Sequence, residues 1–499
     1  MDLLTLLEMT VAGHGDRVVL GTSRSGITAE QLRHRARVGA RRLLESGART
    51  LVYLGENGVG FPIALFAASM AGAPFLPLNY RLSHDQLADV IAAQERPFVI
   101  TADPSVAAGG SVVGTVTVDE WLALTTGSAP AAAEVAVPDP DDEAVLLLTS
   151  GTTAAPKCAV LRHRHLASYV LESVEFSGAD PSEAVIVSVP PYHIAAVANL
   201  LSNLYSGRRI VYLDRFTPEG WLQTVADGRV THAMVVPTML ARIVDELEAG
   251  RSAFPTTLRA LSYGGAPLAP SILERALALL PDVGFVNAYG LTETSSSIAV
   301  LGPEDHREAG ASDDPAVRAR LGSVGRPLPS VEIEIRDASG APAAAGELGA
   351  VYVRGPQVAG EYRQGGSRVD PDGWFPTRDE GYLDEDGYLF VRGRADDTII
   401  RGGENIAPAE IEDAIHQLPG VAEAVVVGIP DPEWGQRIGA FVVAGPGADL
   451  TESDVREFVR GRLRSSKTPD IVTFVDELPR TPTGKIIRRQ LVATVEAAG

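Results

Sequence analysis

Short apolar runs alternate with longer apolar or amphipathic stretches through the first part of the chain. Residues 51–54 form a compact apolar run, residues 60–70 have the length of a packed helix, and residues 73–78 have the pattern of a strand that ends in a turn. This alternation predicts a parallel α/β sheet, because parallel strands need a crossover segment between them. Residues 102–142, rich in Ala, Gly, Pro and Asp, are expected to form a variable connection.

The pattern changes sharply where an apolar run, residues 146–148, meets a polar stretch. The run is followed by Thr149-Ser150-Gly151-Thr152-Thr153 and then by Ala154-Ala155-Pro156-Lys157. Backbone N–H groups and hydroxyls in such a loop can surround an anion, and a lysine adds a mobile charge. The spacing differs from the common G-x-x-x-x-G-K-[ST] loop. The stretch predicts a phosphate site, with a polar surface loop as the alternative interpretation.

Three further loops follow predicted strands, where open α/β sheets bind their ligands. Residues 187–196 end a strand near His193, residues 261–268 contain a glycine pair, and residues 285–294 include Tyr289, Thr292 and Glu293. The last combination supplies a ring for a base, a hydroxyl for phosphate and a hard oxygen ligand for Mg²⁺. The alternatives are a structural histidine at 193 and a helix N-cap at 292–293.

Beyond residue 303 we expect a polar loop up to residue 320 and then a β-rich meander through residues 331–394. A separate small α/β unit follows, with a helix from Pro408 and a capping box at 451–454. It closes with Lys485 in a loop bracketed by Pro and Gly. The pattern predicts a domain of residues 1–395 and a smaller domain of residues 396–499.

Composition narrows the function classes. The 499 residues carry a net charge of -21 and one cysteine, Cys158, which excludes an intramolecular disulfide and a cysteine-based metal cluster. Nucleic acid is not an expected partner, because polyanion binding needs clustered Lys and Arg. The first residues lack a signal-peptide pattern and no apolar run approaches a bilayer span, so we expect a soluble cytoplasmic protein without a membrane partner.

Taken in order, these loops resemble those of the adenylate-forming superfamily, which includes acyl- and aryl-CoA ligases, adenylation domains of peptide synthetases and firefly luciferase. The resemblance covers nearly the whole chain. Residues 149–157 are similar to the family's phosphate loop, and 289–293 to its Mg²⁺ and nucleotide motif. The remaining matches are the ribose contacts Asp379 and Arg394, the hinge Asp396, the pantetheine-tunnel loop that begins at Gly402-Gly403, and the adenylation lysine, Lys485.

The resemblance implies an α/β fold: a large N-terminal domain of parallel α/β sheets with a β-rich subdomain, and a small mobile C-terminal domain hinged near Asp396. It implies catalytic roles for Lys485, Glu293, Thr152, Lys157 and His193, with Glu293 as the metal ligand. The implied cofactor-binding residues are Thr149, Ser150, Gly151, Thr153, Gly265, Ala266, Pro267, Asn287, Ala288, Tyr289, Gly290, Thr292, Asp379, Arg394, Gly402 and Gly403. The implied acid pocket comprises His193, Asn199, Gly264, Ala288 and Ser297.

Three residues depart from the family's pattern. Ala154 and Cys158 stand where glycine is common, and Arg378 replaces the glycine before the ribose aspartate. If position 154 needs positive φ, alanine costs about 1 kcal/mol there. Arg378 adds a charge close to the nucleotide.

The implied function is ATP-dependent activation of a small or aromatic carboxylic acid to an acyl-adenylate, followed by thioester formation with CoA, with Mg²⁺ as the metal. Three alternatives remain open. A carrier-protein phosphopantetheine replaces CoA in the first, for which residues 460–467 supply a basic patch: Arg460, Arg462, Arg464 and Lys467. Another oxyanion, such as nitrite in natural-product biosynthesis, replaces the acid in the second. The third is a catalytically silent homologue, against which the presence of Lys485 argues. The sequence does not predict the oligomeric state.

Overall fold

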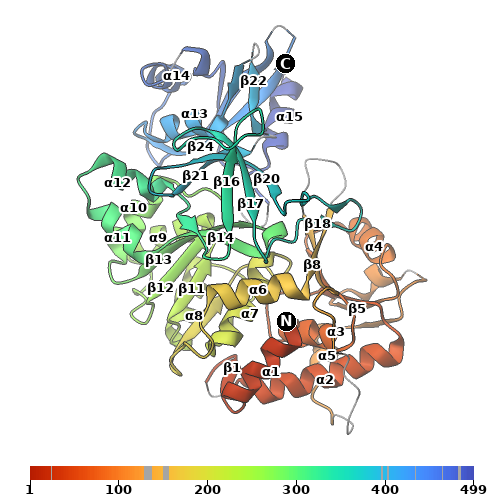
Figure 1. Cartoon of the computed structure of the whole chain (residues 1–499). Coiled ribbons are helices and arrows are strands. Elements are labelled where there is room, and N and C mark those ends of the chain that lie inside the picture. The colour runs from red at the N-terminus through yellow and green to blue at the C-terminus, as the bar shows by residue number, and fades with distance from the viewer. Residues whose placement is uncertain are drawn as a thin grey trace.

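The computed structural model describes residues 1–23, 25–108, 110–128, 137–149, 157–394, 397–401, 404–432, 434–463, 465–481 and 485–498. Two large sheets with their helices form the lower part of the molecule in Figure 1, a four-stranded sheet lies above them, and the blue C-terminal unit lies at the top. This arrangement confirms the expected fold class, with a large N-terminal domain of parallel and mixed sheets and a smaller C-terminal α/β domain.

The nine-stranded sheet has the order β15-β14-β13-β12-β11-β9-β10-β1-β2. Its central strands, from β13 to β1, run parallel, and their carboxyl ends therefore share one edge. The margins are antiparallel. The strands are β1 (Val18–Leu20), β2 (Ile27–Thr28), β9 (Ala184–Val187), β10 (Arg209–Tyr212), β11 (His232–Val235), β12 (Ala260–Gly264), β13 (Gly284–Leu291), β14 (Ser296–Leu301) and β15 (Arg326–Pro327).

The eight-stranded sheet has the order β19-β18-β8-β7-β4-β3-β5-β6. Its strands are β3 (Thr50–Leu54), β4 (Phe75–Pro77), β5 (Pro97–Thr101), β6 (Gly114–Val116), β7 (Glu143–Thr149), β8 (Lys157–Arg162), β18 (Glu361–Tyr362) and β19 (Gly366–Ser367). Strands β7 and β8 are antiparallel with Thr149 opposite Lys157. The expected strand therefore leads directly into the predicted phosphate loop and out of it again, although residues 150–156 lie outside the described residues.

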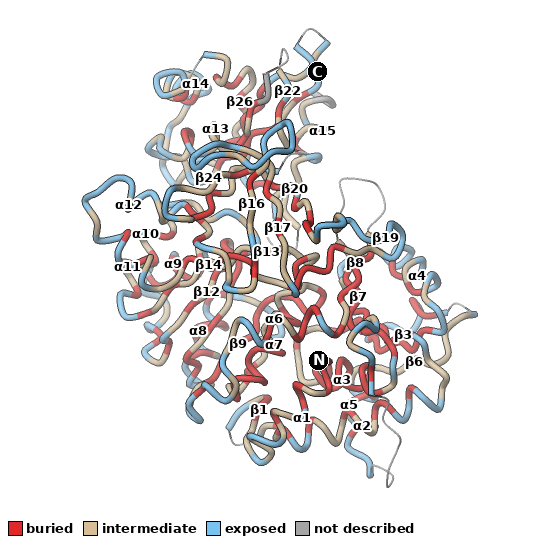
Figure 2. The backbone as a smooth tube through the Cα atoms, in the orientation of Figure 1, coloured by how far each residue is buried: buried red, intermediate tan, exposed pale blue. Residues whose placement is uncertain are grey.

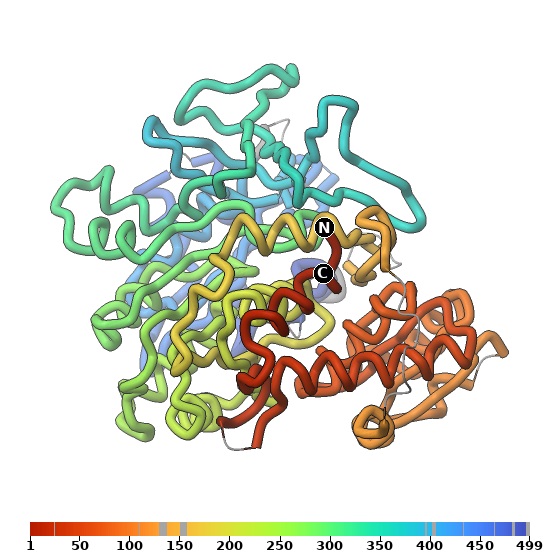
Figure 3. The backbone as a smooth tube through the Cα atoms, turned by 60° about the horizontal axis from the view of Figure 1, so that its bottom comes forward, coloured from red at the N-terminus to blue at the C-terminus, as the bar shows by residue number. Residues whose placement is uncertain are grey.

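Helices join the two large sheets into one core. The helix α1 (Leu3–His14) contacts α2 (Ala29–Ser46), α3 (Gly60–Met70), α6 (His163–Ser173) and α7 (Ile194–Ser206). In Figure 3 this helix is dark red and lies beside the red α2 and near the yellow α6. Leu3, Leu6 and Leu7 are buried in a cluster that draws on both sheets. Because apolar side chains leave water on both sides of α1, the two sheets form a single packed body.

The remaining helices of this body are α4 (His84–Ala92), α5 (Val118–Leu124), α8 (Pro218–Gly228), α9 (Pro237–Glu248), α10 (Pro270–Leu279), α11 (Pro303–Ala311) and α12 (Pro315–Ala319). Figure 2 shows buried strands in red and exposed residues on outer helices such as α4 and α12. One expectation was wrong, because residues 303–320 form α11 and α12 rather than a loop. The expected connection at 102–142 contains α5, whose Trp121 is fully buried.

The β-rich meander is confirmed as an antiparallel four-stranded sheet of β16 (Glu332–Arg336), β17 (Gly349–Arg354), β20 (Phe375–Leu383) and β21 (Leu389–Arg394). In it Asp379 pairs with Arg394 across β20 and β21. The antiparallel register therefore brings the two residues matched to ribose contacts onto adjacent positions.

The C-terminal unit has a five-stranded sheet and its own apolar cores. It comprises β22 (Ile399–Arg401), β23 (Glu404–Ile406), β24 (Val421–Asp431), β25 (Gly435–Ala444), β26 (Ile471–Phe474), α13 (Pro408–His416), α14 (Glu452–Arg460) and α15 (Arg488–Ala498). The expected hinge, Asp396, lies outside the described residues. Within the described part of the chain, no helix has the length and apolar character needed to cross a bilayer.

Candidate active site

Several predicted site residues follow strands that end at one edge of the nine-stranded sheet. His193 precedes α7 after β9, Gly264 ends β12, and β13 passes into the short 3-10 helix η2 (Thr292–Thr294), which carries Glu293. Strands β9, β11, β12 and β13 are parallel neighbours. Their carboxyl ends therefore present these residues at the edge where open α/β sheets bind ligands.

Glycine at position 264 is required by the close approach of β12 and β13. Gly264 is in register with Ala288, and a Cβ at position 264 would lie 2.2 Å from the Ala288 carbonyl oxygen. Ser297 lies on the next strand, opposite Gly290. A Cβ at position 290 would lie 1.9 Å from the Ser296 carbonyl oxygen. The three acid-pocket candidates Gly264, Ala288 and Ser297 therefore lie on three adjacent strands.

Other residues matched to nucleotide contacts lie on or next to the same strands. Gly265, with φ of 84°, begins the turn after β12, and Ala266 and Pro267 follow it. The Asn287 amide nitrogen donates to the Ser323 carbonyl oxygen at 3.1 Å. The side chain of Asn287 is therefore held by the backbone of a neighbouring loop.

Asp379 is the buried carboxylate of a polar cluster. Its Oδ2 accepts from the Tyr289 hydroxyl at 2.5 Å, its Oδ1 lies 3.0 Å from Arg394 Nε, and its backbone N–H donates to Thr377 Oγ1 at 3.1 Å. Burial raises the pKa of Asp379, while Arg394, Tyr289 and Lys485 oppose that rise. Each carboxylate oxygen has a second lone pair, so the cluster can still accept hydrogen bonds from vicinal hydroxyls such as those of ribose.

Glu293 is held by a strand from the other sheet. Its Oε1 accepts from the Tyr362 hydroxyl at 2.5 Å, and its backbone carbonyl accepts from the N–H groups of Ala359 and Gly360 at 2.8 and 3.0 Å. Lys157 Nζ lies 5.9 Å from the centroid of the Tyr362 ring. The structure thus brings Glu293 and Lys157, from the two predicted phosphate motifs, to the same tyrosine.

Lys485 comes from the C-terminal unit and is under the electrostatic influence of the N-terminal residues. It keeps an exposed surface, and loss of water around its ammonium group and the charge of Arg394 lower its pKa, whereas Asp379 and Glu293 raise it. Its charge also acts on His193. Charged groups of the N-terminal domain therefore influence a lysine of the C-terminal unit. Arg392 and Asp413 form an ion pair of 3.0 Å between the two units.

His193 is a half-buried histidine whose ring is neutral. Burial, and secondly the charge of Lys485, lower its pKa to about 3. Its Nε2 is buried and has no hydrogen-bond partner among the described residues. An unpartnered buried nitrogen costs stability unless a ligand or water satisfies it. Asn199, one of the acid-pocket candidates, is half-buried on α7, and its carbonyl and side-chain oxygens accept from Asn203 Nδ2.

Some predicted residues cannot be placed in this way. Ser150, Gly151, Thr152, Thr153 and Ala154 lie outside the described residues, as do Asp396, Gly402 and Gly403. Of the other two departures, Cys158 is buried and its pKa is raised to about 11 by burial. Arg378 has φ of 66°, the left-handed region in which glycine is unstrained.

Tyr362 and Thr377 are site residues that the sequence did not reveal. Tyr362 belongs to a two-residue strand, and it meets Glu293 only through the pairing of β18 with β8. Thr377 fixes the backbone of Asp379 from the next inward-facing position of β20. The spacing Thr377-x-Asp379 on an alternating strand was the one available signal.

The donors and charges at this site fit a magnesium nucleotide. The Asp379 cluster offers acceptors for a ribose, the Glu293 carboxylate is a hard oxygen ligand of the kind Mg²⁺ prefers, and Lys157 and Lys485 supply positive charge for phosphates. Outside residues 150–156, no described group of three or more His, Cys, Asp or Glu side chains forms a metal cluster. A single carboxylate with substrate phosphates is nevertheless the usual way in which Mg²⁺ is held.

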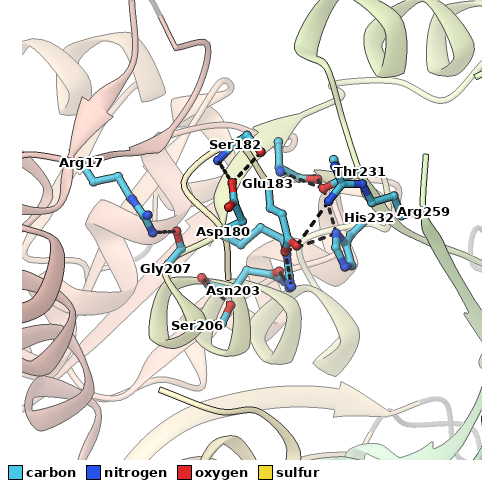
Figure 4. A network of polar contacts seen from close by, with 12 residues as sticks. Arg17, Asp180, Ser182, Glu183, Asn203, Ser206, Gly207, Thr231, His232 and Arg259 are labelled. Carbon is cyan, nitrogen blue, oxygen red and sulfur yellow. Dashed lines mark hydrogen bonds and ion pairs between the residues drawn. The ribbon is translucent and has the colours of Figure 1, made fainter. Parts of the chain in front are cut away.

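A second polar network lies at the opposite edge of the nine-stranded sheet (Figure 4). Glu183, which precedes β9, accepts from Arg208 Nη2 at 2.8 Å and lies near His232 and Arg259, at the amino ends of β11 and β12. Burial, and secondly the charge of Arg208, lower the pKa of His232 to about 4. This network ties the amino ends of three strands together and stands apart from the candidate active site.

Comparison with known proteins agrees with this geometry. Residues 7–363 match the family described as AMP-binding enzyme, and residues 410–485 match the AMP-binding enzyme C-terminal domain. The chain is 33% identical to the fatty acid–[acyl-carrier-protein] ligase ScoC of Streptomyces coeruleorubidus, over 93% of this chain and 91% of the relative. It is 34% identical to the 2-succinylbenzoate–CoA ligase of Bacillus licheniformis, over 95% and 96%. ATP-bound MatB from Rhodopseudomonas palustris is similar in structure, with a TM-score of 0.88, 28% identity and full coverage of both chains.

Proposed function

Because this chain belongs to the AMP-binding enzyme family and is an AMP-forming acid–thiol ligase, we propose that it activates a small or aromatic carboxylic acid with ATP and Mg²⁺ and transfers the acyl group to CoA. The observation that carries this proposal is the pair of fixed carboxylates at the site: Asp379 accepts from the Tyr289 hydroxyl at 2.5 Å and lies 3.0 Å from Arg394 Nε, and Glu293 accepts from the Tyr362 hydroxyl at 2.5 Å. Asp379 then holds the nucleotide, and the acid ends near His193.

In the first half-reaction, a carboxylate oxygen of the acid attacks the α-phosphorus of ATP. The bond between that phosphorus and the bridging oxygen breaks, and pyrophosphate leaves with the electron pair. Two anions must approach each other, so positive charge that is fixed in advance lowers the barrier. Lys485 binds the carboxylate and the α-phosphate, and Lys157, with Thr152, holds the leaving pyrophosphate. Glu293 would hold Mg²⁺, which would supply neutralising charge to the phosphates.

In the second half-reaction, the thiol sulfur attacks the acyl carbon, AMP leaves with the electron pair of the acyl–oxygen bond, and the thiol proton passes to solvent. We propose that the C-terminal unit turns about a hinge near Asp396, at the boundary between residues 1–395 and 396–499. The turn withdraws Lys485 and brings Gly402 and Gly403 to the site, where the absence of side chains admits a thin pantetheine arm.

The pocket candidates favour an uncharged body on the acid. Gly264, Ala288 and Ser297 are small, Asn199 is neutral, and the low pKa of His193 keeps its ring neutral at physiological pH. His193 Nε2 needs a partner, which a polar atom near the carboxylate of the substrate would supply. A buried second charge would find no opposite charge among these five residues. ATP and CoA are cytoplasmic metabolites, so we place the enzyme in the cytoplasm.

A carrier protein is the second candidate acceptor, because one relative is named as an acyl-carrier-protein ligase. The expected basic patch is smaller than the sequence indicated. Lys467 is paired with Glu410 and is largely buried, and Arg464 lies outside the described residues. Arg460 and Arg462 remain exposed, the latter stacked on Phe458. Two arginines suffice for a weak acidic partner and equally for the phosphates of CoA.

The test is pyrophosphate release across a panel of aromatic, short-chain, fatty and amino acids plus nitrite, with products identified by mass spectrometry. We expect an AMP ester with one acid class, and its thioester when CoA is added. If a thioester formed only with a phosphopantetheinylated carrier protein, the acceptor would be that carrier protein rather than CoA. Failure of every acid, with release of pyrophosphate in the presence of nitrite alone, would contradict the proposal.

A further inference from the structure

The hairpin formed by β18 and β19 pairs edge to edge with β8, the strand that follows the predicted phosphate loop. Tyr362 pairs with Ala159 of β8, and the Arg363 N–H donates to the Cys158 carbonyl oxygen at 3.0 Å. Glu361 is paired with Arg162 at 2.7 Å, and Arg363 is paired with Glu143. Ion pairs on both sides of Tyr362 thus hold the hairpin in one register beside Lys157, the first residue of β8.

The same hairpin fixes one carboxylate. The Tyr362 hydroxyl donates a hydrogen bond to Glu293 Oε1 at 2.5 Å, and the backbone N–H groups of the two residues just before β18 donate to the Glu293 carbonyl oxygen. With its backbone and one carboxylate oxygen both engaged, Glu293 has a single orientation and presents Oε2. A carboxylate fixed in this way binds a hard cation without first losing conformational freedom.

Two cations lie near the Tyr362 ring. Lys157 Nζ and the Arg368 Cζ each lie 5.9 Å from its centroid. Arg368 is exposed and has no ion pair among the described residues, and its backbone N–H donates to the Gly360 carbonyl at 2.8 Å, which closes the hairpin. In a chain of net charge -21, two cations near the ring whose hydroxyl contacts Glu293 can together bind a polyvalent anion.

We propose that the β18–β19 hairpin is a second phosphate-binding element, in which Tyr362 positions the Glu293 carboxylate and Arg368 works with Lys157 to bind the β- and γ-phosphates of ATP and then pyrophosphate. This inference rests on the proposed function, because it assigns a role within the same site. Arg368 contacts substrate oxygens directly, whereas Tyr362 acts through Glu293.

Nucleotide binding separates the role of Arg368 from a general effect. We compare Kd values of α,β-methylene-ATP and AMP for the wild type, Arg368→Ala and Arg368→Lys, with Arg307→Ala, an exposed arginine on α11, as the control. Arg368→Ala should weaken the ATP analogue about tenfold and raise the inhibition constant of pyrophosphate similarly, since a charge-assisted hydrogen bond to phosphate is lost. AMP has no β- or γ-phosphate, so its Kd should not change. Arg368→Lys should recover part of the loss.

Tyr362→Phe tests the positioning of Glu293. We expect the Mg²⁺ concentration that half-saturates analogue binding to rise several-fold, while binding of the analogue without Mg²⁺ stays the same. An unchanged Mg²⁺ dependence, or an Arg368→Ala variant that binds the analogue like the wild type or loses AMP equally, overturns the inference. These readouts involve no acid, so they are independent of adenylate formation; a wild type that binds the analogue but adenylates nothing overturns the proposed function alone.

Discussion

Replacing Tyr289 with phenylalanine removes one hydroxyl from the buried cluster around Asp379. That hydroxyl donates to Asp379 Oδ2 at 2.5 Å, and Arg394 Nε remains as the partner of Oδ1. Hydrogen bonds to charged groups contribute about 1.5–3 kcal/mol, and the phenylalanine ring needs no partner of its own, so we take the lower end, about 1.5 kcal/mol. If Asp379 holds the ribose, this loss corresponds to an about tenfold higher Kd for both ATP and AMP.

The pH dependence of AMP binding reports the direction in which Tyr289→Phe moves the pKa of Asp379. Burial already raises the pKa of Asp379, and the Tyr289 hydrogen bond lowers it, so Tyr289→Phe raises the pKa further. A protonated carboxyl loses acceptor capacity, and nucleotide affinity therefore falls as the pH drops through this pKa. We expect the fall to begin at a higher pH in the variant than in the wild type.

The assay is isothermal titration calorimetry with AMP at a series of pH values. Tyr388→Phe is the matched control, because the Tyr388 hydroxyl is buried and donates to Asp305 Oδ1 at 2.7 Å in a different cluster. That variant should lose stability without a change in AMP affinity. A wild-type affinity and pH profile in Tyr289→Phe, or a profile moved to lower pH, would refute the reasoning.

Three further predictions concern separate parts of the molecule. Lys485→Ala should slow adenylate formation about 100-fold or more, since a fixed cation is lost where two anions meet, while thioester formation from synthetic acyl-adenylate continues; equal loss in both half-reactions would contradict the assignment. Trp121→Ala should lower the free energy of unfolding in urea by about 3–5 kcal/mol through the cavity it leaves, with AMP affinity of the folded protein unchanged, because Trp121 is fully buried beside Gly39 and Phe98. The Cys158 thiol, with its pKa raised to about 11 by burial, should resist alkylation at pH 8 until the chain unfolds, as followed by mass spectrometry; rapid labelling of the native protein would show an open site.

The pattern of apolar residues predicted those helices and strands that bury many apolar side chains. The helix expected at 60–70 is α3 without a change of bounds, because every residue of it is buried and its composition is apolar throughout. In α11, by contrast, only His306 and Ala309 are buried, so the helix has hardly any apolar stripe and its residues have the composition of a loop.

The sequence predicted the candidate site residues that belong to single motifs, but not the contacts between distant segments. Glu293, Asp379, Arg394 and Lys485 were each named from their own motif, but the hydroxyl that orients Glu293 comes from Tyr362, which is 69 residues away in the sequence. Such a contact depends on how β18 pairs with β8 and how the two large sheets meet. Period and composition describe one element at a time, and they hold no information about a contact of that kind.

The position of α1 has a consequence for synthesis on the ribosome. Leu3, Leu6 and Leu7 are buried against helices that include α7, and β1 pairs with β10, both of which emerge some 200 residues later. Helix α1 can contact α2 and α3 early in synthesis, but its contact with α7 and the pairing of β1 with β10 must wait until those later segments have been translated. Until then, the part of α1 that packs on α7 is exposed to solvent, so α1 is a segment where a holdase chaperone would act.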